Sequence, residues 1–183
     1  MCRSGSEASR VLERIRSTLE GLGLGLKDSK TRIVHLTEGG PGFDFLGFHH
    51  RWVRARRARH VTFLARWPST RAMQGARDRI CDLTSRSNLL LSDEEVIKRV
   101  NRFFRSWAAY FRYGNSARFF NKIHSYAVAH LCTLVGSRHK GYAKLGWYLA
   151  VHKGKIYRRI VNLNGSILAP RPNRPWRASK CRR

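Results

Sequence analysis

Three places in this sequence carry residue types that could do chemistry, and none has the spacing of a complete catalytic site. His49-His50 offers two metal ligands, but few carboxylates are near and no third ligand has suitable spacing. Glu94-Glu95 is the adjacent acidic pair that a two-metal site would need, yet it falls at an expected helix start, where carboxylates favour the helix dipole. The glycines of residues 21–25 follow a helix and lack the GxxxxGK[ST] pattern of a phosphate loop. We therefore expect no catalytic residue, no metal and no cofactor.

Positive charge dominates the composition. Lys and Arg number 37 against 11 Asp and Glu, a formal net charge of +26, and the 88 residues after Glu95 hold 20 Lys or Arg and no acid. Such an imbalance predicts a polyanionic partner. A very soluble surface or an anionic membrane surface would be alternatives, but the cations are interleaved with aromatic residues, which favours nucleic acid. Arg outnumbers Lys 28 to 9, which suits RNA, although a GC-rich genome would give the same bias.

The cysteines and the apolar runs indicate the compartment. Cys2, Cys81, Cys132 and Cys181 are scattered, with no CxxC pair and no regular spacing, which argues against a zinc site and a disulfide framework. No apolar run approaches the roughly 20 residues of a membrane span. The first residues also lack the apolar core of a signal peptide. We expect a cytoplasmic, bacterial protein without a membrane segment.

The first third of the chain is expected to mix a helix with short strands. Residues 7–22 have the apolar spacing of an amphipathic helix. β-Branched residues predict a strand at 31–36, and aromatic residues predict another at 43–48. We expect residues 51–59 to form a basic turn, with 61–64 returning as its hairpin partner.

From residue 70 onward the apolar period becomes helical. Residues 70–86 form the first expected helix, and Ser92 with Glu95 forms a capping box that starts the second. Gly114 is the expected C-cap of that second helix, and Ser116 is the expected N-cap of a third.

The third helix is expected to run to about residue 136, and the remainder is less regular. A shorter helix is predicted at 142–151. Residues 154–168 are predicted to form an irregular hairpin that turns at Asn164-Gly165. The last residues, rich in Pro and Arg, are expected to form a flexible basic tail.

Aromatic side chains around the end of the second helix are candidates for RNA contact. Trp107, Phe111 and Phe119 fit the core better than a surface. Tyr110 and Tyr113 fall at the helix end and in the following turn, where stacking on bases is feasible. Arg112 and Asn115 in the same stretch could contact phosphates.

Two longer motifs resemble a known family. LGLKDSKTRIVHL, residues 24–36, followed by GFDFLGF, residues 42–48, is similar to the end of the palm in group II intron reverse transcriptases. There a turn ending in Lys-Thr precedes a strand and then an FxFLGF strand that helps to grip the primer. VNRFFRSWAAYFRYGN, residues 100–115, resembles the thumb and maturase-specific segment, with Ser106 in place of the usual Gly. The order and spacing of the motifs match over residues 8–150.

One part of the family pattern is missing. The catalytic Tyr-Ala-Asp-Asp hairpin should stand just before residues 7–22, and the chain contains no Asp-Asp pair. The sequence therefore resembles the C-terminal fragment of such an enzyme, without polymerase activity of its own and without the Cys-rich endonuclease appendix. The resemblance implies an α+β fold with a palm remnant at 1–67, a helical thumb and maturase domain at 68–153, and a hairpin-like segment with a basic tail at 154–183.

The resemblance also implies a function and a set of residues. The function is binding of structured group II intron RNA, which stabilises its splicing-competent form. The alternatives are a non-functional remnant, or one half of a split RNA-directed DNA polymerase completed by a separate finger–palm chain. Phe45, Leu46 and Gly47 would correspond to the primer grip and are expected to be structural here. The expected RNA-binding residues are Lys30, Arg102, Arg105, Tyr110, Arg112, Tyr113, Asn115, Arg118 and Lys122.

Overall fold

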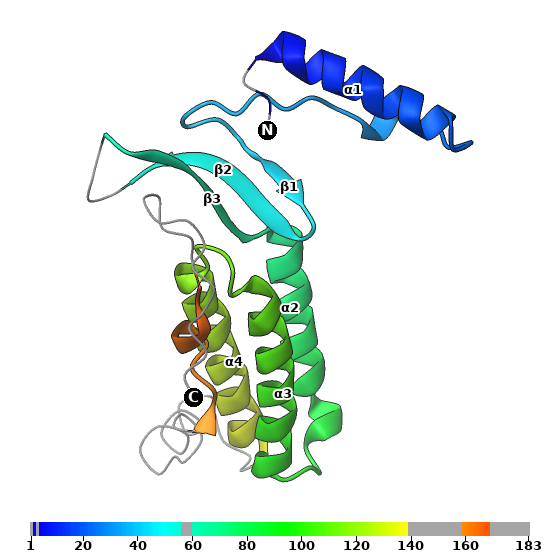
Figure 1. Cartoon of the computed structure of the whole chain (residues 1–183). Coiled ribbons are helices and arrows are strands. Elements are labelled where there is room, and N and C mark those ends of the chain that lie inside the picture. Colours follow the sequence, from blue (N-terminus) through cyan, green and yellow to red (C-terminus); the bar gives the residue numbers. More distant parts are fainter. Residues whose placement is uncertain (1, 3, 56–59, 139–158, 169–183) are drawn as a thin grey trace, which may run out of the picture.

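A helix, a small antiparallel sheet and a bundle of helices follow one another along the chain (Figure 1). The computed structural model describes residues 2, 4–55, 60–138 and 159–168. The architecture is the α+β mixture that the sequence predicts. The described helices and strands are α1 (Gly5–Glu20), β1 (Phe43–Phe45), β2 (Phe48–Arg54), β3 (Thr62–Pro68), α2 (Thr70–Leu83), α3 (Asp93–Phe111) and α4 (Ala117–Arg138), with short 3₁₀ turns at Asp28–Lys30, Arg86–Asn88 and Asn164–Ser166.

The strands form a meander in the order β1-β2-β3, and each neighbouring pair is antiparallel. Residues 43–48 are not the single strand that the sequence predicts. Phe45 pairs with Phe48, and Leu46 and Gly47 turn the chain between them with φ of 47° and 75°. Two successive positive φ values match the twist of a tight hairpin, and Gly47 supplies one of them without strain.

Two other strand predictions are also corrected. Residues 31–36 follow a 3₁₀ turn and are not a strand, because β propensity alone gives no ladder without a paired neighbour. Residues 51–54, expected in a basic turn, belong to β2, so the hairpin is longer than predicted. Residues 56–59 of that turn lie outside the described residues.

The bundle of α2, α3 and α4 contains the hydrophobic core. Phe104 and Phe120 are fully buried at its centre, together with Ile80, Val100 and Ile123. Complete burial of such side chains contributes about 1.5–3 kcal/mol each. The apolar stripe of α3 faces this core: its members are either buried or packed against it, and they are Val96, Val100, Phe103, Phe104, Trp107 and Phe111. The Ser69 and Ser92 hydroxyls cap α2 and α3 by accepting from the N–H groups of Ala72 and Glu95, and the cap at Ser92 is the one that the sequence predicts.

The turn between α3 and α4 is built differently from the expected pair of caps. Gly114 has no room for a side chain, because a Cβ would lie 2.7 Å from the Arg66 carbonyl oxygen and 3.2 Å from Phe48. Its role is a close approach to β3. The Ser116 hydroxyl, expected to cap α4, is fully buried and donates to the Phe111 carbonyl at 2.8 Å. It therefore stabilises the end of α3.

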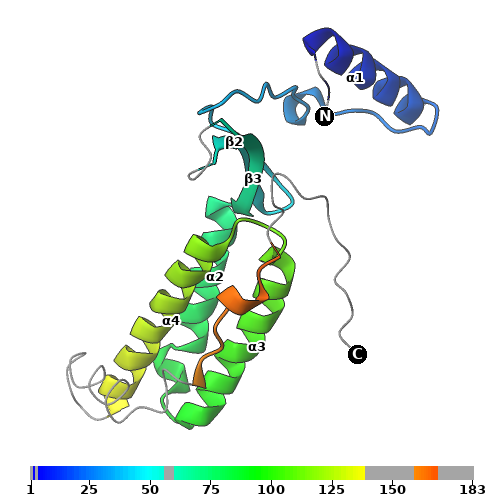
Figure 2. The ribbon, with the colours of Figure 1, turned by 60° about the vertical axis from the view of Figure 1, so that its left-hand side comes forward.

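Residues 159–168, here called the crossing segment, lie along α3 and α4 (Figure 2). The side chain of Asn101 on α3 binds the backbone of the crossing segment twice. Its Nδ2 donates to the Arg159 carbonyl, and its Oδ1 accepts from the Val161 N–H. No strand occurs in the crossing segment, so its predicted hairpin is wrong there, and Asn164-Gly165 falls in a 3₁₀ turn. The predicted helix at 142–151, residues 154–158 and the tail lie outside the described residues.

Helix α1 stands apart from the sheet and the bundle (Figure 1). Its apolar stripe exists as predicted, but none of its residues is buried, and Val11 and Ile15 are 44% and 46% exposed. Both the remnant and the split-enzyme alternatives expect an uncovered face here, so this exposure does not separate them. Within the described part of the chain no helix combines the length and apolarity needed to cross a membrane.

Gly114→Ala should destabilise the protein by about 1–3 kcal/mol, because the new methyl group would press on backbone that cannot move freely. The control is Gly75→Ala on α2, where a Cβ meets nothing within 4 Å and alanine should be neutral or stabilising. Urea unfolding of both variants measures the difference. Equal unfolding midpoints for the two variants would contradict the close approach.

Leu46→Asn should stabilise the protein by about 1 kcal/mol, because asparagine tolerates the left-handed conformation that Leu46 adopts. Little burial is lost, since Leu46 is 68% exposed. Thermal unfolding gives the readout, with Leu90→Asn as a control at a leucine that is 99% exposed. A lower unfolding temperature for Leu46→Asn than for the control would overturn the assignment of strain to this turn.

Candidate nucleic-acid interface

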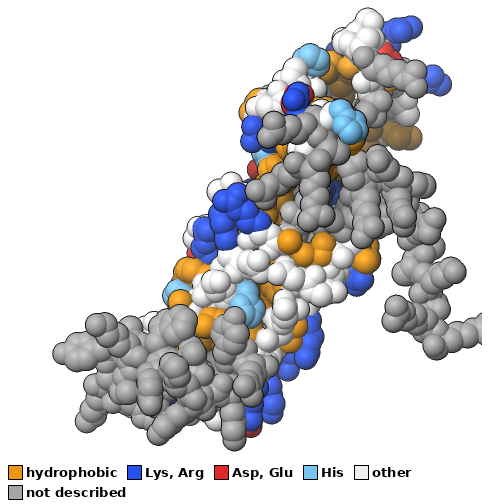
Figure 3. Space-filling view, turned by 90° about the vertical axis from the view of Figure 1, so that its left-hand side faces the viewer, with side chains coloured by type: hydrophobic (Ala, Val, Ile, Leu, Met, Phe, Trp, Pro, Cys, Tyr) orange, Lys and Arg blue, Asp and Glu red, His pale blue; other side chains and the backbone are white. Residues whose placement is uncertain are grey.

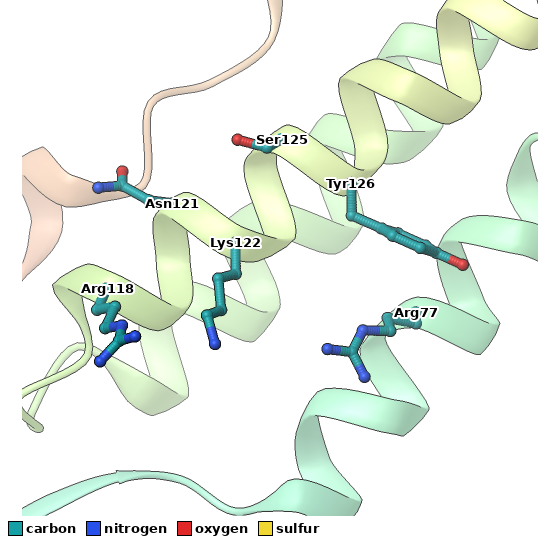
Figure 4. A pocket seen from close by; sticks show the side chains of 6 residues that line it. All are labelled: Arg77, Arg118, Asn121, Lys122, Ser125 and Tyr126. Carbon is teal, nitrogen blue, oxygen red and sulfur yellow. The ribbon is translucent and has the colours of Figure 1, made fainter.

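A basic hollow lies between α2 and α4. It has a volume of about 830 Å³, and none of the lining residues is acidic. Figure 4 shows the Arg118 and Lys122 side chains pointing from α4 toward the side where Arg77 extends from α2. We call this site the basic hollow; its lining is Arg77, Arg118, Asn121, Lys122, Ser125 and Tyr126.

The packing of α2 on α4 places these cations together. Ile80 on α2 and Ile123 and Ala127 on α4 are completely buried. Since residues three or four apart share a helix face, Arg77 lies at the margin of the buried face of α2, and Lys122 lies one turn after Arg118 on α4. The Lys122 ammonium lies 5.9 Å from the centre of the Phe119 ring. This is a cation–π contact, which attracts the ammonium group to the face of the ring.

Tyr126, which lines the basic hollow, belongs to a polar cluster. The Tyr126 hydroxyl lies 3.1 Å from the Cys81 Sγ, and the Tyr126 ring packs on His130 with 4.4 Å between ring centres. The hydrogen bond with Cys81 and partial burial raise the pKa of Tyr126 above its usual value. Tyr126 therefore stays protonated at neutral pH and presents a neutral hydroxyl beside the cations.

All three acids in the first turn of α3 are paired within the fold. Asp93 pairs with Arg138, Glu94 with Arg159, and Glu95 with Arg99. In the space-filling view Lys and Arg form blue patches along the bundle, with little red beside them (Figure 3). These acids thus neutralise cations near the start of α3, and Arg77, Arg118 and Lys122 take part in none of these pairs.

A second hollow, of about 480 Å³, lies between the β1–β2 turn and the end of α3. Tyr110 joins the two elements: its hydroxyl donates to the Leu46 carbonyl at 2.7 Å, and its ring stacks on Phe48 with 5.5 Å between centres. We call this site the aromatic hollow; its lining is Phe45, Leu46, Phe48, His50, Arg66, Ala109, Tyr110 and Tyr113.

Cations flank the aromatic hollow. The Arg66 guanidinium lies 5.7 Å from the centre of the Phe48 ring, and its Nε donates to the Tyr113 carbonyl at 2.8 Å. The Arg112 guanidinium lies 5.4 Å from the centre of the Tyr113 ring. Burial, helped by Arg66 and His49, holds the pKa of His50 below its usual 6.5, although Asp44 acts in the opposite direction.

The predicted RNA-binding residues fall into separate groups. Arg118 and Lys122 meet in the basic hollow, and Tyr110 and Tyr113 meet in the aromatic hollow. The predicted primer-grip residues Phe45 and Leu46 line that second hollow, which the sequence did not indicate. The other predicted residues lie outside both linings: Arg102 and Arg105 are exposed on α3, Lys30 is exposed in the 3₁₀ turn after α1, and Arg112 follows α3.

Asn115 has a clear structural contact. Its side-chain oxygen accepts from the Arg66 N–H at 3.3 Å, and its own N–H donates to the Arg66 carbonyl at 2.6 Å. The residues predicted from the sequence to bind RNA do not include Arg77 and Tyr126 of the basic hollow or His50 and Arg66 of the aromatic hollow. Arg77 stands three residues before Ile80 on the expected helix, but only the α2–α4 contact brings it to Arg118.

A metal centre has no support in the described residues. Asp44 and His49 lie 2.6 Å apart across the β1–β2 pair, but no third His, Cys, Asp or Glu joins them, nor does any other cluster of three form in the described ranges. The Asp44 carboxylate and His49 Nδ1 form a simple hydrogen-bonded pair on the surface of the sheet.

The fold and its surface define a class before any relative is considered: a strongly basic helical bundle that carries a small β-meander and presents cationic and aromatic hollows. A comparison with family models then gives one match. Residues 73–152 are similar to the model described as "Group II intron, maturase-specific domain".

The match begins inside α2 and includes α3 and α4, and residues 139–152 of it lie outside the described residues. It confirms the resemblance seen in residues 100–115. The matched domain is a non-catalytic one. A search of curated proteins found no matching relative. The palm interpretation of residues 24–48 falls outside the match and stays a prediction.

His50 should make the stability of the fold depend on pH. Its pKa is lower in the folded than in the unfolded chain, so its stabilising contribution is complete above 6.5 and is lost as pH falls through the folded pKa. We expect the urea midpoint to fall between about pH 7.5 and about pH 5.5, and to fall less in His50→Gln. His35→Gln, at an exposed histidine, is the control. If His50→Gln and His35→Gln show the same fall, the assignment to His50 is wrong.

Proposed function

We propose that the chain binds structured group II intron RNA and stabilises its folded, splicing-competent form. The basic hollow carries this proposal: three cations from two helices converge there, no lining residue is acidic, and the hollow lies inside the stretch that matches the maturase-specific domain, since its first lining residue is Arg77. The matched domain is one that binds intron RNA. The chain would act by binding, with no catalytic step of its own.

The basic hollow suits a folded RNA backbone. Arg118 and Lys122 are one helical turn apart, and Arg77 faces them across the hollow (Figure 4). Cations at this spacing can contact neighbouring phosphates, and the Tyr126 hydroxyl can donate to a phosphate or a ribose hydroxyl beside them. Arg102, Arg105, Arg112 and Lys30 would add phosphate contacts outside the hollow.

The proposal is tested with a triple variant, Arg77→Ala/Arg118→Ala/Lys122→Ala. Binding to a structured group II intron RNA and to an unrelated RNA of equal length is measured by filter binding over a range of salt. The wild-type protein should retain the intron RNA near physiological salt and release the unrelated RNA. The triple variant should lose that retention, and the salt dependence of its binding should fall by about one unit of slope per lost phosphate contact.

The matched control is Arg14→Ala/Lys27→Ala/Arg32→Ala. It removes the same charge at exposed positions in the first 32 residues, distant in sequence from the basic hollow. It should retain the intron RNA near physiological salt. If the wild-type protein releases both RNAs together as salt rises, its binding is unspecific and the maturase function is excluded for this chain. If the two triple variants behave alike, total charge, and not the basic hollow, sets the affinity.

A further inference from the structure

We propose that the aromatic hollow binds an unpaired nucleobase, so that the chain prefers RNA with a base extruded from a duplex. This inference rests on the proposed RNA binding and names the feature of the RNA that is recognised. Four large apolar side chains of the aromatic hollow are exposed: Phe45 by 59%, Leu46 by 68%, Tyr110 by 51% and Tyr113 by 41%. Such a cluster on the surface of a highly charged chain indicates a ligand with apolar faces.

The rings of the aromatic hollow are held in place before any ligand arrives. Tyr110 is bonded through its hydroxyl to Leu46, stacks on Phe48, and meets Phe111 edge-on at 4.9 Å and 82°. Phe48 in turn packs on the buried Phe111 at 4.9 Å. A flat ligand that stacks here would lose little entropy to side-chain ordering.

The charges around the aromatic hollow favour a nucleotide over an apolar peptide. Arg66 lines the hollow and Arg112 lies beside Tyr113, while none of the lining residues is acidic. The carboxylate nearest in sequence, Asp44, pairs with His49 instead. A base can stack on the rings while its phosphate reaches a guanidinium, a combination typical of single-stranded nucleic-acid sites. The volume of about 480 Å³ is in the range of small-ligand sites.

Consecutive residues of β3 connect the two hollows. Arg66 lines the aromatic hollow, and Trp67 stacks on Phe119 with 5.9 Å between ring centres. The same Phe119 ring carries Lys122 of the basic hollow. Because successive side chains of a strand point to opposite faces of the sheet, the two hollows are separate surfaces joined through the end of β3.

The test compares two RNAs of equal length, a fully paired duplex and a duplex with a single bulged nucleotide, by fluorescence anisotropy at low salt, where phosphate contacts should also keep unrelated RNA bound. The wild-type protein should bind the bulged RNA about fivefold to tenfold more tightly, as expected for one base stacked on aromatic rings. Tyr113→Ala and Phe45→Ala should each reduce this preference. Tyr113→Phe and Phe45→Tyr, which keep the ring, should retain it. Circular dichroism and unfolding midpoints establish that each variant is folded.

The outcomes separate this inference from the proposed function. Tight, equal binding of both RNAs by the wild-type protein would overturn the base site and leave the RNA-binding function standing. If the wild-type protein binds neither RNA at this salt, both proposals are overturned together. If both alanine variants keep the preference for the bulged RNA, the base binds elsewhere and the proposed base site in the aromatic hollow is wrong. The basic-hollow triple variant should weaken both RNAs by a similar factor.

Discussion

The close approach of β3 to the turn between α3 and α4 fixes the relation of the sheet to the bundle. Arg66 is bound by this turn in three places: its N–H donates to the Asn115 side chain, its carbonyl accepts from the Asn115 N–H, and its Nε donates to the Tyr113 carbonyl. Gly114 permits the approach because a Cβ would meet the Arg66 carbonyl oxygen at 2.7 Å. One of these bonds joins two backbone groups and the other two each involve a side chain, and together they position the end of the sheet on the bundle.

The close approach of β3 to the turn between α3 and α4 also positions one of the surfaces that we propose for RNA binding. The β1–β2 turn reaches Tyr110, and the Gly47 carbonyl accepts from the Ser69 N–H at 2.8 Å just before α2 begins. The aromatic hollow exists only because this turn and the end of α3 are held against each other. The basic hollow depends on a different contact, the apolar packing of α2 on α4. The chain thus joins a site suited to phosphates with one suited to a base, and each is set by a separate part of the core.

The fold also has to accommodate a large positive charge. A formal charge of +26 disfavours a compact chain, and the fold compensates in two ways. It buries a continuous apolar core in the bundle, and it pairs the acids of the first turn of α3 with arginines from α4 and the crossing segment. The Asp93–Arg138 and Glu94–Arg159 pairs thereby also tie distant parts of the chain to the start of α3. The cations of the basic hollow lie outside these pairs, where an RNA backbone can neutralise them.

The sequence by itself determined the α+β class, the helices of the bundle, the cap at Ser92, and the resemblance of the helical half to a maturase-specific domain. These depend on local signals: apolar residues at helical spacing, a hydroxyl-bearing residue before a helix, and a contiguous sequence motif. It also showed the positive charge and candidate aromatic residues, because composition needs no structure.

Only the tertiary structure decided which side chains meet. The strand expected at 31–36 has no partner, the aromatic run at 43–48 turns at Leu46-Gly47, and Gly114 serves a close approach in place of a helix cap. Arg77 joins Arg118, and Leu46 joins Tyr110, across separations of 41 and 64 residues that no periodicity reveals. Local propensity determines which segments form helices. The pairing of strands and the docking of helices depend on contacts between segments far apart in the chain, and these contacts form both hollows.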